Sequence, residues 1–290
     1  MAAALRTQEV SRRSFIGKAS AGIAALSPLA RSLSAAPLGI PIGCQVYPVR
    51  EMLGKDFDGT LRKLAAIGYK TIEMCSPQGY ARSGFEPLAA MKASEMRRRI
   101  RAAGLECESC HYTMRELREH LQERIAFAQE LGLKQMILSS FAVGRSAAIT
   151  EWVRAAGELN RMAEEIHKAG IQAGFHNHDG EFKELDGVLI YDKLMSELNP
   201  KLVRMQFQAV VVRLGFEAPA IFEKYPGRFL SLHLQDWSPA EKKMVAIGQG
   251  QVDWKKLFGA AKDAGVRNYF VEMNLELMKA SYPYLNRLQV

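Results

Sequence analysis

A strict alternation of short apolar runs and longer amphipathic stretches, repeated eight times after residue 38, constrains the fold of this chain more than any other feature. The apolar runs have the length of β-strands, and the amphipathic stretches have helical spacing. Glycines that commonly end helices, Gly68, Gly104, Gly170 and Gly265, come just before the next apolar run. Eight consecutive βα units predict a closed parallel barrel, the α/β class with a (β/α)8 TIM-barrel fold.

The predicted elements fill the chain without a linker or a low-complexity segment. The predicted strands cover 40–46, 70–75, 105–111, 135–139, 171–176, 202–208, 229–234 and 268–273. The predicted helices cover 59–67, 87–103, 114–131, 152–169, 188–198, 217–225, 253–264 and 275–288. Since one such barrel uses about 250 residues, we predict a single domain over residues 37–290 and a loop over 237–252 that can act as a lid.

The first 36 residues have the pattern of an export signal. Arg12 and Arg13 precede a weakly apolar stretch over 19–29, and Ser34-Ala35-Ala36 offers small residues for cleavage. Paired arginines ahead of such a stretch are typical of twin-arginine signals. We therefore predict a periplasmic or secreted protein. The apolar stretch is too short to span a bilayer, so no stable membrane anchor is expected after cleavage.

Charge and cysteine usage narrow the choice of partners. Residues 1–36 hold five basic residues and one acidic residue, so the rest of the chain carries 34 basic and 30 acidic residues. This small excess gives no reason to expect nucleic acid as a partner. The basic cluster over 97–101 has helical spacing, which favours a solvated face over a phosphate-binding patch.

The four cysteines are predicted to be reduced. Cys107 and Cys110 lie in one predicted strand, where a separation of three residues places them about 10 Å apart on opposite faces, too far to pair with each other. We expect Cys44 and Cys75 in the core.

Polar side chains gather at the carboxyl ends of the predicted strands, where parallel barrels carry their active sites. Four of the six histidines lie at such ends. The residues concerned are Glu73, His111, His176, His178, Gln208, His233 and Glu272.

Four of these residues follow one another at the spacing of a strand-helix unit. His176, Gln208, His233 and Glu272 are separated by 32, 25 and 39 residues. Two imidazoles, an amide oxygen and a carboxylate suit a divalent ion such as Mn²⁺, Zn²⁺, Co²⁺ or Mg²⁺. The sequence thus predicts one metal ion, and the alternative is a set of unrelated polar residues at a barrel mouth.

Several motifs in this order resemble those of the xylose isomerase-like barrels known as sugar phosphate isomerases/epimerases. They are Gln45–Arg50, Ile67–Glu73, Phe175–Phe182, Tyr225–Phe229, Leu232–Asp236, Gly248–Trp254 and Tyr269–Glu272. The resemblance implies metal ligands Glu, Asp, His and Glu after strands five to eight. His233 and Glu272 match the last two, whereas His176 (with His178 nearby) and Gln208 replace the two acids by neutral groups.

The resemblance also implies a reaction, the abstraction of a proton next to a sugar carbonyl. Glu272 is the expected base and a metal ligand, and His111 or His178 is a second acid-base group. Glu73 and Glu181 are expected to contact sugar hydroxyls, and Trp237 to stack on a sugar face. Export disfavours a phosphorylated substrate, so a small non-phosphorylated carbohydrate is the expected partner.

Other functions stay open at this point. The loss of acidic ligands weakens the case for two-base epimerisation, and a lyase or dehydratase acting on a 3-keto sugar or glycoside is the first alternative. A non-catalytic sugar-binding barrel is the second. A metal-dependent endonuclease is disfavoured, because the chain lacks the acid-rich ligand set of a multi-metal cluster. The oligomeric state, a homo-oligomer included, is left open.

Overall fold

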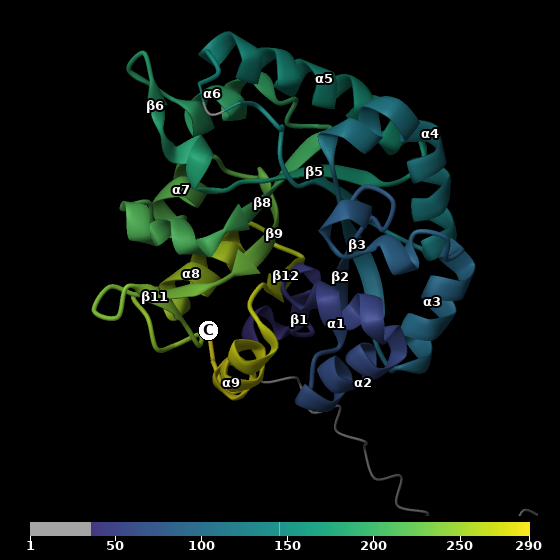
Figure 1. Ribbon diagram of the computed structural model, residues 1–290. Helices are drawn as coiled ribbons and strands as arrows, with labels where there is room; N and C mark the ends of the chain where they lie inside the picture. The colour runs from purple at the N-terminus through teal and green to yellow at the C-terminus, as the bar shows by residue number, and fades with distance from the viewer. Residues whose placement is uncertain (1–35, 145) are drawn as a thin grey trace, which may run out of the picture. The chain divides into compact units, whose positions relative to one another are not determined.

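The computed structural model describes residues 36–144 and 146–290, and the predicted export signal lies outside them except for Ala36. Eight parallel strands close into a barrel with helices around it (Figure 1), which confirms the predicted TIM-barrel fold. In order around the barrel the strands are β1 (Gly43–Gln45), β2 (Thr71–Cys75), β3 (Glu106–Tyr112), β4 (Gln135–Leu138), β5 (Gln172–His176), β8 (Val203–Gln208), β9 (Phe229–Leu234) and β12 (Asn268–Val271).

The helices follow the predicted order with one addition and with shifted ends, and the largest shift is at the start of α3. They are α1 (Arg50–Lys55), α2 (Phe57–Ile67), α3 (Ala93–Ala102), α4 (Met114–Leu131), α5 (Ile149–Lys168), α6 (Ile190–Glu197), α7 (Ala218–Lys224), α8 (Trp254–Asp263) and α9 (Leu275–Leu285). The short α1 was not predicted. The predicted start of α3 at residue 87 is wrong, because a separate 3₁₀ turn covers Glu86–Leu88 and Lys92 is extended (ψ 146°) before the helix begins.

The glycines that end the helices have the backbone conformation expected of them. Gly68, Gly104, Gly170 and Gly265 have φ angles of 125°, 79°, 77° and 74°. Side chains other than glycine rarely adopt positive φ. These positions therefore terminate each helix and turn the chain into the next strand, as the sequence predicts.

The buried apolar core of the protein includes all four cysteines. All four cysteines are free and buried, and Cys44 and Cys75 lie in the core, as predicted. Within the described residues, no helix has both the length and the apolar character needed to cross a membrane.

The predicted loop over 237–252 contains a hairpin formed by β10 (Asp236–Ser238) and β11 (Lys243–Val245). The fully buried carboxylate of Asp236 accepts hydrogen bonds from the backbone N–H groups of Gly248, Gly250 and Val252 and from Nε1 of Trp254. The motif Gly248–Trp254 is thus tied to this carboxylate, which fixes the segment that follows β9.

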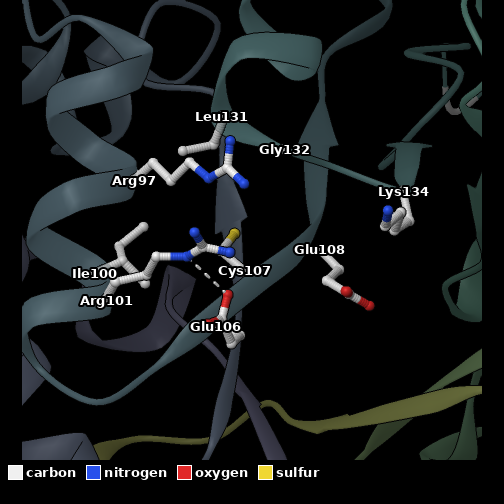
Figure 2. Close-up of a pocket in the computed structure, with 9 residues that line it drawn as sticks. All are labelled: Arg97, Ile100, Arg101, Glu106, Cys107, Glu108, Leu131, Gly132 and Lys134. Atoms are coloured by element: carbon white, nitrogen blue, oxygen red, sulfur yellow. Dashed lines mark hydrogen bonds and ion pairs between the residues drawn. The ribbon is translucent and has the colours of Figure 1, made fainter.

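The basic cluster of α3 lies at the opposite end of the barrel from the strand carboxyl ends, beside the first residues of β3 (Figure 2). Nε of Arg101 lies 3.2 Å from a carboxylate oxygen of Glu106, and Nε of Arg99 lies 2.8 Å from Asp58. The cavity between Arg97, Arg101 and Glu106 holds only about 100 Å³. These ion pairs fit the predicted solvated face.

Candidate metal centre and active site

The polar residues predicted to share the barrel mouth come together there. His111, His176, Gln208 and His233 lie at or next to the last residues of β3, β5, β8 and β9, and Glu272 directly follows β12. Because all these strands are parallel members of one barrel, their carboxyl ends meet at one face. All but Glu272 are buried, and the side chain of Glu272 is 15% exposed.

Three histidines form a compact cluster in this face. One ring nitrogen each of His111, His176 and His233 lies within 4.8 Å of the others. The ring centroids of His176 and His233 are 4.3 Å apart, and those of His111 and His233 are 5.0 Å apart. His111, which the sequence suggests as an acid-base group, therefore lies where it can also be a metal ligand.

His176 is the member of this cluster that lacks partners. Neither ring nitrogen has a hydrogen-bond partner among the described residues, although the side chain is buried. Burial, reinforced by the neighbouring imidazoles of His233 and His178, lowers the pKa of His176 well below its ordinary value. A buried polar atom without a partner is rare, and neutral imidazole is the form that binds metal ions. The Oε1 atom of Gln208 also lacks a partner, so this donor set fits a divalent ion.

Glu73 lies beneath the histidines as a fully buried carboxylate. Its Oε2 atom accepts a hydrogen bond from Nε2 of His233 at 2.5 Å. Nε2 of His111 lies 3.1 Å from the same oxygen and is hydrogen-bonded to Oε1 of Gln206 at 2.7 Å. Its Oε1 atom accepts from Ser109 Oγ at 2.6 Å and Gln206 Nε2 at 2.8 Å. Burial acts to raise the pKa of Glu73, but the two imidazoles outweigh it and hold that pKa well below its ordinary value. The structure thus places Glu73 as a support for the histidines, whereas the sequence suggested a contact with substrate.

The polar layer that surrounds Glu73 was not predicted from the sequence. Ser109, Gln206 and Ser231 are each two residues before a residue of the mouth, and Gln206 Nε2 donates to Ser231 Oγ at 3.1 Å. Alternate residues of a strand point to the same face. Counting back two residues from His111, Gln208 and His233 would therefore have identified this polar layer in the sequence.

Glu272 closes the cluster on the solvent side. Its Oε2 atom accepts hydrogen bonds from Gln208 Nε2 at 2.9 Å and Gln235 Nε2 at 3.0 Å, and it lies 3.1 Å from Nδ1 of His233. Burial acts to lower the pKa of His233, but the two carboxylates, Glu272 and Glu73, raise it to about 9. The predicted set of Gln208, His233 and Glu272 is therefore in direct contact, with the ring of His176 alongside.

A cavity of about 550 Å³ opens above this cluster, a volume within the range of small-molecule sites. It is lined by Gln208 and Glu272 and by His178, the predicted acid-base group. Trp237, predicted to stack on a sugar, lies beneath the guanidinium of Arg213, whose carbon is 5.3 Å from the ring centroid.

Glu181 lies beside the cavity but turns inward. Its carboxylate accepts the backbone N–H of His178 at 2.7 Å, and the side chain is buried. In this place Glu181 fixes the turn that carries His178. Both residues also line a neighbouring cavity of about 680 Å³.

The buried carboxyl of Glu181 leads to a pH-dependent prediction. Burial raises its pKa to about 7. Because the pKa is raised on folding, the stability linked to this group is fully present below the ordinary carboxyl pKa and is lost as the pH rises through about 7. When the pH is raised from about 5 to about 8, we expect the unfolding free energy of the wild type to fall by ~2–3 kcal/mol more than that of the Glu181→Gln variant. Urea unfolding of both proteins at the two pH values measures this, and parallel pH dependences would contradict it.

Comparison with known proteins agrees with this architecture. Residues 61–278 match the family described as xylose isomerase-like TIM barrel. The chain belongs to the xylose isomerase-like TIM barrel family. Solved structures of this fold resemble the chain. A sugar phosphate isomerase/epimerase from Parabacteroides distasonis is 24% identical with a TM-score of 0.71, covering 85% of this chain and 94% of that one.

A second structure is a xylose isomerase-like TIM barrel protein from Mycobacterium smegmatis in complex with magnesium. It is 14% identical with a TM-score of 0.62, and the match covers 85% of this chain and 95% of that one. The inosose dehydratase of Lacticaseibacillus casei is 24% identical over 139 residues, 42% of this chain and 46% of the dehydratase. The match therefore spans about half the length of that relative.

Proposed function

We propose that this xylose isomerase-like barrel is a metal-dependent enzyme that removes a proton next to the carbonyl of a non-phosphorylated sugar, as isomerases and epimerases do. The unpartnered nitrogens of buried His176, set against His111 and His233 and next to the carboxylate of Glu272, carry the proposal. The magnesium bound by the mycobacterial structure supports the metal, and the name of the Parabacteroides protein, a sugar phosphate isomerase/epimerase, supports the class of reaction. The restriction to non-phosphorylated sugars rests on the predicted export signal.

Each residue of the mouth has a role in this proposal. His111, His176 and His233 would hold a divalent ion, with Gln208 and Glu272 as the further predicted ligands. Because the pKa of His233 is raised, the ion would have to displace the proton that lies between Nδ1 of His233 and Glu272. When bound, such an ion stabilises the negative charge that develops on a substrate oxygen. Glu272 takes the proton, and the N–H donors of Gln208 and Gln235 on its Oε2 atom orient it. His178, which lines the same cavity, is the second acid-base group.

A lyase or dehydratase acting on a 3-keto sugar or glycoside is the second candidate, and the carboxylates around the cavity favour it. Glu73 is fully buried with both oxygens hydrogen-bonded, and Asp179 is ion-paired with Arg213. This leaves Glu272 as the carboxylate of the cavity lining that is free of a guanidinium or ammonium partner. Epimerisation by two carboxylates on opposite sides of a sugar does not fit one base, whereas elimination needs one base and one acid. The resemblance to an inosose dehydratase points the same way.

Solvent deuterium separates these candidates. The protein, supplied with Mn²⁺, is incubated in D₂O with a panel of keto-sugars, 3-keto-glycosides and inososes, and the products are followed by NMR and mass spectrometry. Deuterium next to the carbonyl in an otherwise intact sugar indicates an isomerase or epimerase. Loss of water or of an aglycone indicates a lyase or dehydratase.

Binding of these sugars without exchange or elimination would contradict both enzymatic candidates and would favour the non-catalytic sugar-binding barrel. Exchange that is equally fast after the metal is removed with a chelator would contradict the metal-dependent mechanism. The sugar-binding measurement and the chelator experiment use the same protein preparation, so their outcomes are directly comparable.

A further inference from the structure

One positive charge at the mouth of the cavity has no ionic partner. Arg50, at the start of α1, lines the same cavity as Glu272, Gln208 and His178. Among residues 36–144 and 146–290, Arg50 forms no ion pair, and its one side-chain hydrogen bond runs from Nη1 to the backbone carbonyl of Tyr47 at 2.9 Å. Most N–H donors of this guanidinium are therefore left for a ligand.

The other charges of the cavity lining are accounted for. The guanidinium of Arg213 is paired with the carboxylate of Asp179. The Oε2 atom of Glu272 is contacted by Gln208, Gln235 and His233. Within the described residues, Arg50 is therefore the charged side chain of the lining that has no ionic partner and only a single side-chain hydrogen bond.

Arg50 is also held in place, which is unusual for an unpaired arginine. Its guanidinium carbon lies 4.3 Å from the centroid of the Tyr47 ring, and that ring packs edge-on against Tyr80 at 5.9 Å. Gly84 lies beside the stem of Arg50, since a Cβ added to this glycine would be at an ordinary contact distance of 3.4 Å from Cγ of Arg50. A guanidinium fixed on an aromatic face loses less entropy when it binds a ligand.

We propose, building on the proposed function, that the substrate is an acidic sugar whose anionic group is bound by Arg50 while the reacting carbons lie near Glu272. The planar fork of a guanidinium matches two oxygens of a carboxylate or a phosphate. The two anions share this chemistry. The predicted export favours the carboxylate of a sugar acid.

Paired probes test this inference. The full chain loaded with Mn²⁺ is titrated by calorimetry with glucuronate against glucose, galacturonate against galactose, and glucose 6-phosphate. We expect at least one acid to bind about tenfold or more tightly than its neutral counterpart. A uronate preference identifies a carboxylate, and a preference confined to glucose 6-phosphate identifies a phosphate.

Two variants assign the preference to its residue. Arg50→Gln keeps a polar stem and should abolish the preference for the acid while binding of the neutral sugar persists. Arg82→Gln, an exposed arginine outside this cavity, should keep the preference. Circular dichroism and the unfolding midpoint check that both variants fold as the wild type does.

Three results would overturn the inference: equal binding of acids and neutral sugars, a preference that survives in Arg50→Gln, or no acid binding at all. If the protein takes up metal and turns over neutral sugars without a preference for acids, this inference is wrong and the proposed function stands. If the protein neither holds metal nor acts on any sugar, both are wrong.

Discussion

The Glu73→Leu variant should unfold with a free energy about 3–5 kcal/mol lower than that of the wild type. Glu73 is fully buried, and its two oxygens accept hydrogen bonds from His233, Ser109 and Gln206. Leucine leaves Nε2 of His233 and Oγ of Ser109 in the barrel without this acceptor, and an unsatisfied buried polar group costs more than the apolar contacts of leucine return. Urea unfolding of the metal-free proteins measures the difference.

Two matched variants show whether the loss comes from the carboxylate. Glu73→Gln keeps one acceptor oxygen, so we expect a loss of only about 1–2 kcal/mol. The same replacement by leucine at exposed Glu95 should change stability by about 0.5 kcal/mol or less. A Glu73→Leu protein as stable as the Glu95→Leu protein would mean that the buried network does not support the histidines.

The Glu272→Gln variant should lose about 10²- to 10⁴-fold in the rate of proton exchange, the contribution typical of a general base. The amide cannot take a proton from the substrate, although it has nearly the shape of the carboxylate. Exchange is followed in D₂O with whichever sugar the wild type turns over. Metal content of the same sample must be measured, because Glu272 is also a predicted ligand.

Asp179→Asn is the matched control, since it makes the same acid-to-amide change in another carboxylate of the cavity lining. Asp179 is paired with Arg213, so we expect its replacement to cost less than about tenfold in rate. If Glu272→Gln retains metal and exchanges protons nearly as fast as the wild type, Glu272 is not the base.

The barrel was predictable from the sequence because its signals are local. Each strand is a short apolar run, and glycines such as Gly68 and Gly104 end the preceding helices with positive φ. The polar residues at strand ends were predictable for the same reason, since parallel strands bring their carboxyl ends to one face. The prediction that a helix begins at residue 87 was wrong, because a 3₁₀ turn over Glu86–Leu88 lies close to α3 in the sequence and extended Lys92 separates the two.

The detailed contacts of the site depend on residues that are distant in the chain. Glu73 reads as one more strand-end acid, yet its contacts with His233 span 160 residues and place it under the cluster. His111 joins His176 and His233 only because the barrel closes. The pairing of Arg213 with Asp179, which leaves Arg50 unpaired, likewise depends on two loops from different strands.

Metal content shows most directly whether the cluster of His111, His176 and His233 binds an ion. The purified protein is dialysed with Mn²⁺ or Zn²⁺, separated from free metal and measured by inductively coupled plasma mass spectrometry. The His176→Leu variant is compared with His167→Leu, which makes the same change at an exposed histidine. Because neither nitrogen of His176 has a partner among the described residues, leucine at this position should leave the metal-free protein about as stable as before.

We expect about one metal ion per chain in the wild type and in His167→Leu, as for a single site, and strongly reduced content in a folded His176→Leu protein. No bound metal in the wild type, or full occupancy in His176→Leu, would contradict this expectation.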